Sequence, residues 1–188
     1  PGSGRATQAA KLAADFDLTI VSTGELLQNE VKTSGSLAAE VAPLLEKGLL
    51  VPDEIVIRLI EKKLRQSQGQ GRGFIFKGYP RTLVQAYILD GLLRKQGSGV
   101  SCVINLKVPV FELIRRLDAR SRTHSSMPYD GSAATIVARL QEHEERTEPV
   151  LEYYASKGQV LNVDAKDNPE NVYSMVKVLV SKAIRSLR

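Results

Sequence analysis

The chain has 188 residues, of which 43% are hydrophobic and 25% are charged, as in an ordinary globular domain. This composition excludes a disordered or fibrous chain, and the single cysteine, Cys102, excludes an internal disulfide and a multi-cysteine zinc site. No apolar run approaches the ~18 residues of a membrane span, and no signal-peptide pattern is present, so we expect a reduced, cytoplasmic setting. The net charge of +5 indicates a polyanionic partner: nucleic acid, a membrane surface or nucleotide phosphates.

The sequence opens on a glycine-rich turn, Pro1-Gly2-Ser3-Gly4, which leads into a helical pattern over 7–16. A turn of this kind normally follows a buried strand. Because the first residue here is Pro1, we expect that the N-terminal strand is missing and that the chain is a fragment of a longer protein.

Short strands and amphipathic helices then alternate along the chain. Apolar residues at helical spacing predict helices over 25–32, 37–46, 52–64, 83–93, 110–117, 133–154 and 169–187. Short apolar or β-branched runs predict strands over 18–21, 74–76, 100–106 and 160–163. Pro149 lies inside one predicted helix, where we expect a bend or an interruption.

This alternation predicts an α/β fold, with a parallel sheet and helices on both faces. Right-handed crossovers would bring the carboxyl ends of the strands to one rim, where ligands bind in such folds. The segment 121–132 is rich in Ser, Pro and Gly and has no apolar periodicity, so it is predicted to be a loop. We expect a single domain over 1–188.

Several motifs, in order along the chain, resemble those of the adenylate kinase family of P-loop nucleoside monophosphate kinases. Residues 1–8 resemble GxPGSGKGTQ, 22–27 resemble STGDLLR, 46–52 resemble EKGxLVP, 73–85 resemble GFLIDGYPRxxxQ, and 115–120, 139–140 and 147–150 resemble the arms and exit of the lid. The resemblance implies the P-loop kinase fold, with a small helical NMP-binding insert at about 22–51 and a short lid at about 121–132.

The resemblance also implies an activity and its residues: phosphoryl transfer between ATP and AMP, giving ADP. Backbone N–H groups at a helix N-terminus cradle phosphates, and the positions that match this role are Gly2, Ser3, Gly4, Arg5, Ala6 and Thr7. The positions that match the AMP site are Thr23, Gly78, Arg81 and Gln85. The guanidinium and catalytic candidates are Arg5, Arg81, Arg116, Arg120 and Arg139.

The sequence departs from the family at positions that handle phosphate and metal. Arg5 stands where the family has the P-loop lysine, and its larger, planar group cannot occupy a point-charge site unchanged. Gln28 replaces an arginine that grips the AMP phosphate. Lys77 replaces an aspartate that orders the waters of Mg²⁺, and a lysine there should repel the ion. We therefore expect no metal-ligating residues and little role for Mg²⁺.

The lid departs as well. Pro128 and Gly131 stand where the family has an arginine and an aspartate, and Arg122 is a candidate replacement for that arginine. Low or absent enzymatic activity is therefore expected.

Two functions stay open. The chain is a weakened adenylate kinase, or it is a catalytically inactive kinase-fold module that serves as a nucleotide-binding or structural part of a larger protein or assembly. Nucleotides are the expected partners. Neither a membrane nor nucleic acid is an expected partner. Nucleic acid is not expected because aromatic residues, on which single-stranded nucleic acids stack, are only 5% of the chain.

Overall fold

The computed structural model describes residues 2–33, 37–47, 49–67, 71–123 and 132–185, the side chains at 135 and 139 excepted. The helices in these ranges are α1 Arg5–Phe16, α2 Thr23–Lys32, α3 Ala38–Lys47, α4 Asp53–Gln66, α5 Leu83–Lys95, α6 Val110–Ser121, α7 Ala133–Ser156 and α8 Pro169–Arg185. The strands are β1 Thr19–Ser22, β2 Phe74–Lys77, β3 Val103–Lys107 and β4 Val160–Asp164.

Every predicted helix and strand is present, with ends that differ by a few residues. Helix α7 is not interrupted at Pro149, whereas a bend there stays a prediction. The carboxyl-terminal half of α7 is held by packing, since Val150 and Tyr154 are buried against Ala86 of α5. Tertiary packing of this kind keeps a helix continuous despite one lost backbone hydrogen bond.

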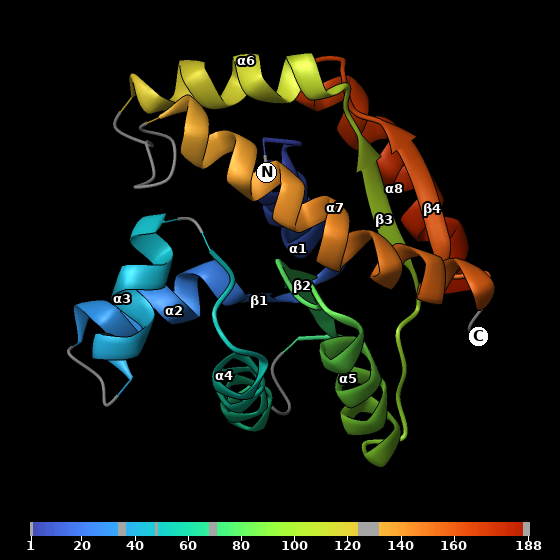
Figure 1. Cartoon of the computed structure of the whole chain (residues 1–188). Coiled ribbons are helices and arrows are strands. Elements are labelled where there is room, and N and C mark those ends of the chain that lie inside the picture. Colours follow the sequence, from blue (N-terminus) through green and yellow to red (C-terminus); the bar gives the residue numbers. More distant parts are fainter. Residues whose placement is uncertain (1, 34–36, 48, 68–70, 124–131, 186–188) are drawn as a thin grey trace.

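The strands are parallel, as predicted, and among the described residues they form two pairs. In one pair β1 lies beside β2, with Ser22 opposite Lys77. In the other, β3 lies beside β4, with Val103 opposite Val160. Helices α1 and α8 pack on one face of the strands, and α4, α5 and α7 pack on the other (Figure 1). This confirms the α/β fold with helices on both faces.

The buried apolar residues of the described chain fall into separate clusters. The largest joins β1, α4 and α5 around Val21, Ile60 and Leu89. A second joins α1, β4 and α8 around Leu12 and Val176, and the smaller third is the contact between α5 and α7 described above.

Helices α2 and α3 stand beside the strands rather than over them (Figure 1). They occupy the region predicted as the NMP-binding insert, 22–51, and its nucleotide-binding role stays a prediction. Of the predicted lid, 121–132, residues 124–131 lie outside the described residues. No helix in the described ranges is both long enough and apolar enough to span a lipid bilayer.

Candidate functional site

The glycine-rich turn leads directly into α1. Gly4 is the residue that precedes the helix, and its φ of 90° lies in the left-handed region that favours glycine. No side chain caps the N-terminus of α1, and its first turn contains no acidic residue. The partial positive charge at this helix end therefore meets no carboxylate from its own first turn, which suits an anion such as a phosphate group.

The cations of this region share one opening at the rim. Arg5, Lys77 and Arg81 all line a cavity of about 1080 Å³, together with Gly78. Arg5 comes from the start of α1, and Lys77 is the last residue of β2. Three of the basic residues singled out from the sequence therefore line one large cavity.

Lys77 is paired with a carboxylate. Its Nζ lies 2.6 Å from Oε1 of Glu25, in the first turn of α2. The hydrogen bond from Lys77 holds the pKa of the Glu25 carboxyl below its usual value. Sequence reasoning missed this partner, although Glu25 occupies the acidic position of the STGDLLR motif.

The pairing of Lys77 with Glu25 bears on the expectation that Mg²⁺ has little role here. Magnesium prefers carboxylate oxygens and waters in octahedral geometry. The carboxylate of Glu25 is already neutralised by an ammonium group at hydrogen-bonding distance. Within the described residues, no group of three His, Cys, Asp or Glu side chains is placed to hold a metal ion.

Three of the residues predicted for AMP lie together. A Cβ on Gly78 would lie 3.9 Å from Cβ of Thr23 and 3.3 Å from Nη2 of Arg81. Nε of Arg81 donates to the carbonyl oxygen of Gly78 at 3.1 Å. Thr23 is 6% exposed, and its Oγ1 has no hydrogen-bond partner in the part of the chain that the structure describes. Such orphaned buried hydroxyls are rare and call for an explanation.

Gln85, the fourth AMP candidate, is held by the protein. It is 3% exposed, its Oε1 accepts from the backbone N–H of Arg81 at 2.8 Å, and its Nε2 donates to Oδ1 of Asp53 at 2.8 Å. The hydroxyl of Thr82 donates to the other oxygen of Asp53 at 2.9 Å. Asp53 was not singled out from the sequence, where it reads only as an acidic residue in the first turn of a helix.

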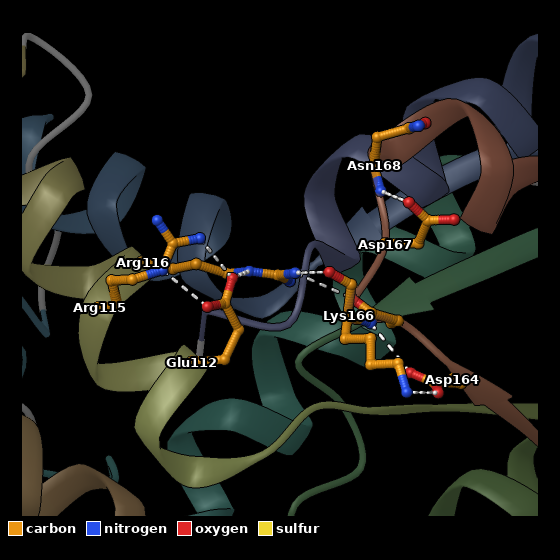
Figure 2. Close-up of polar contacts among 8 residues, drawn as sticks. Glu112, Arg115, Arg116, Asp164, Lys166, Asp167 and Asn168 are labelled. Atoms are coloured by element: carbon orange, nitrogen blue, oxygen red, sulfur yellow. Dashed lines mark hydrogen bonds and ion pairs between the residues drawn. The ribbon is translucent and has the colours of Figure 1, made fainter.

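Arg116 also contacts the protein through its guanidinium group, as Figure 2 shows. Nε donates to Glu112 at 2.7 Å, and Nη2 donates to the carbonyl oxygens of Ala165 and Lys166 at 3.0 and 3.1 Å. Arg115 also donates to Glu112, and the two arginines, Arg115 first, lower the pKa of Glu112 to about 2. Arg116 thereby ties α6 to the loop between β4 and α8.

The other predicted residues lie on α2, α6 and α7 or outside the described residues. Arg120 lies half-buried near the end of α6, and Gln28 lies half-buried on α2. The side chain of Arg139, in α7, is not among those described, and Pro128 and Gly131 lie outside the described residues. Arg122 donates to Asp118 at 2.8 Å with both side chains largely exposed.

The comparisons with known proteins identify a family for the chain. Residues 1–159 match the sequence model of the adenylate kinase family. The adenylate kinase of Thermus thermophilus is 36% identical over 177 residues, which cover 94% of this chain and 91% of the relative. That of Deinococcus radiodurans is 39% identical over 180 residues, covering 94% and 90%, and that of a Synechococcus strain is 36% identical over 180 residues, covering 96% and 92%. The chain therefore belongs to the adenylate kinase family.

Proposed function

We propose that the chain binds ATP and AMP at this rim and transfers the γ-phosphoryl group of ATP to a phosphate oxygen of AMP, giving two ADP, at a much reduced rate. We infer the reduced rate from the ion pair between Lys77 and Glu25. It places an ammonium group, already neutralised, at the end of β2, where the family motif GFLIDGYPRxxxQ has an aspartate.

Two features of the rim support nucleotide binding. The uncapped N-terminus of α1 behind the glycine turn suits the ATP phosphates. The buried hydroxyl of Thr23, next to Gly78 and Arg81, suits a polar atom of the AMP base. A bound base would supply the partner that Oγ1 of Thr23 lacks.

The weak catalysis follows from how phosphoryl transfer is accelerated. The reaction depends on positioning and on preorganised charge rather than on covalent chemistry by the protein. Removal of one such charge commonly costs ~10²–10³ in rate. Each of Arg5, Gln28 and Lys77 changes one such charged group relative to the family's residue. The effects of residues that act together need not add.

The same residues lead us to propose that nucleotide binding depends little on Mg²⁺. Within the described residues, no group of three metal-ligating side chains is placed to hold the ion, and Arg5, at the start of α1, can contact phosphates directly. Affinity for ATP, measured by calorimetry, should change little when EDTA is added. An affinity that collapses with EDTA would contradict this part of the proposal.

The test of catalysis is a coupled ADP-formation assay with and without Mg²⁺. The chain is compared with the double variant Arg5→Lys, Lys77→Asp, which restores the family's residues. The matched control is Arg65→Lys, Lys62→Asp, which makes the same changes on the exposed face of α4. We expect ADP formation to rise ~10²-fold or more only in the first variant, and only with Mg²⁺. Turnover of the unaltered chain at ordinary rates of ~1–100 s⁻¹ would contradict weakened catalysis.

The second candidate function is an inactive nucleotide-binding or structural module. It is favoured by Gln85 and Arg116, whose polar side-chain groups are hydrogen-bonded to other groups of the protein rather than presented to a ligand. In that case the chain binds nucleotides, yet neither it nor the double variant forms ADP. A double variant that does form ADP excludes this second function for the folded scaffold.

A further inference from the structure

The direction of the Gln85 carboxamide is set by its two partners. Oε1 accepts from the backbone N–H of Arg81 at 2.8 Å, and Nε2 donates to Oδ1 of Asp53 at 2.8 Å. A carboxamide turned end for end would direct its oxygen at the carboxylate of Asp53 and its NH₂ group at the N–H of Arg81. Two acceptors and two donors would then face each other, and neither pair can form a hydrogen bond. The two partners therefore allow the side chain only one direction.

Asp53 is the partner that contributes a side chain to this arrangement. It is the first residue of α4, whereas Gln85 lies in the first turn of α5. The other oxygen of its carboxylate, Oδ2, accepts from the hydroxyl of Thr82 at 2.9 Å. The hydroxyl oxygen of Thr82 in turn accepts from the backbone N–H of Gln85 at 3.2 Å. Because a carboxylate has acceptors only, Asp53 determines where the hydrogens lie in this network between α4 and α5.

Burial makes the direction of the amide costly to reverse. Gln85 is 3% exposed, so water cannot readily replace the partners that a reversed amide would lose. The N–H of Arg81 belongs to the backbone and does not depend on which side chain that residue carries. The carboxylate of Asp53 is the stronger partner, because hydrogen bonds to an ionised acceptor are stronger than neutral ones.

The same amide keeps hydrogen-bonding capacity for a ligand. An amide nitrogen has two hydrogens and an amide oxygen has two lone pairs, and one of each is used within the described residues. The remaining donor and acceptor adjoin the proposed AMP site, since Gln85 is bonded to Arg81, and Arg81 is bonded to Gly78.

Two purine bases differ in the edge that they would offer to this amide. Adenine presents an acceptor nitrogen, N1, beside an amino group that donates. Hypoxanthine, the base of IMP, presents the reverse, an N1–H donor beside a carbonyl oxygen. A site that is built to pair with one pattern of donors and acceptors rejects the other, because its buried polar groups would be left unpaired.

We propose that Asp53 is a positioning residue for base recognition: by fixing the direction of the Gln85 carboxamide, it makes the site prefer adenine to a 6-oxopurine such as hypoxanthine. This role rests on the function proposed above, in which the AMP base lies near Thr23, Gly78 and Arg81. A nucleotide whose phosphate is held has its base edge in a fixed place, so an amide held in one direction matches only one of the two edges. Asp53 acts through Gln85 and does not itself touch the nucleotide.

The first test is Asp53→Asn, a substitution that keeps the shape of the side chain. Because asparagine offers either an oxygen or an NH₂ group, it accepts the Gln85 amide in both directions, and only the N–H of Arg81 then fixes it. The matched control is Glu54→Gln, the same chemical change at the next residue, which is exposed. Affinities for AMP and for IMP are measured by calorimetry.

We expect the ratio of AMP affinity to IMP affinity to fall about 5-fold or more in Asp53→Asn and to stay unchanged in Glu54→Gln. A purely structural role of Asp53 would weaken the binding of both nucleotides alike and leave the ratio as it is. An unchanged ratio in Asp53→Asn would therefore overturn the proposal.

A second variant exchanges the two side-chain types by combining Asp53→Asn with Gln85→Glu. The pair again joins an NH₂ donor to a carboxylate, and that carboxylate again accepts from the N–H of Arg81, so the midpoint of thermal unfolding should change by less than about 5 °C. Only acceptors then face the base. Affinity for AMP should fall about 10-fold or more, and IMP, with its N1–H donor, should be favoured relative to AMP. A folded double variant that keeps the ratio of the unaltered chain would contradict the proposal.

A third measurement needs no nucleotide. Hydrogen exchange of the Gln85 side-chain amide, followed by NMR, reports how firmly Asp53 holds it. Exchange should be about 10-fold or more faster in Asp53→Asn than in the unaltered chain or in Glu54→Gln, and equal rates would overturn the proposal whatever the nucleotide affinities are. An unaltered chain that binds neither AMP nor IMP would instead overturn the function proposed above and, with it, the role of Asp53 in base preference. The two failures are distinguishable, because only in the second is AMP binding itself absent.

Discussion

Two parts of the rim differ in how they are built. The part around Thr23, Gly78 and Gln85 matches the family's motifs; Thr23 and Gln85 are buried, and Gln85 is hydrogen-bonded to Arg81 and Asp53. The part around Arg5 and Lys77 has changed residues at positions that handle phosphate and metal. From this contrast we expect this scaffold to keep its recognition of the base while the charges that speed phosphoryl transfer are altered. Three variants test the contrast.

The largest effect is expected from Asp53→Ala, which removes the acceptor shared by Gln85 and Thr82. Nε2 of the buried Gln85 is then left without its partner, so we expect the free energy of unfolding to fall by about 1–3 kcal/mol. Urea denaturation measures the loss. The control is Glu54→Ala, an exposed acidic residue in the same first helical turn. Equal losses in the two variants would show that the helix end, not the Gln85 contact, is responsible.

An intermediate effect is expected from Thr23→Val, which keeps the shape of the side chain and removes the unpartnered hydroxyl. Stability should stay level or rise by up to about 1 kcal/mol, because a buried unpaired polar group is lost. Affinity for AMP should fall by roughly 2–10-fold if that hydroxyl contacts the base.

Ser67→Ala is the matched control for Thr23→Val. Like the hydroxyl of Thr23, the hydroxyl of Ser67 is buried and has no hydrogen-bond partner in the described chain. It should affect stability in the same direction and leave AMP binding unchanged. Calorimetric titration with AMP separates the two variants. Unchanged AMP affinity in Thr23→Val would remove Thr23 from the proposed base site.

The smallest effect is expected from Lys77→Met, which breaks the ion pair with Glu25. Because the pKa of Glu25 is lowered in the folded chain, the pair stabilises the fold above pH ~4.5, and that stabilisation is lost as pH falls through the lowered pKa. Since Glu25 is 67% exposed, the contribution should stay below about 1 kcal/mol. The difference in unfolding free energy between the chain and the variant should therefore shrink from pH 7 to pH 3. A difference that does not change with pH would mean that the ion pair contributes nothing.

Much of the fold could be predicted from the sequence. Period and turn residues are local signals, so the helices and strands were found with ends only a few residues off, and the order of motifs identified the rim. The continuity of α7 could not be predicted, because it depends on Val150 and Tyr154 packing against another helix. The division of the described strands into two pairs could not be predicted either, because no local pattern reports which strands pair.

For the site, the sequence by itself determined which residue types stand at the rim: the glycine turn, Arg5, Thr23, Lys77 and Arg81. Only the tertiary structure decided what they contact. Lys77 and Glu25 are 52 residues apart in the chain, and Gln85 and Asp53 are 32 apart. Arg116 and Ala165 are 49 apart. Such pairs form only when the packing of the elements brings residues from distant parts of the chain together. A hydrogen bond needs its donor and acceptor to lie within about 3 Å of each other, and this distance depends on the packing rather than on the local sequence.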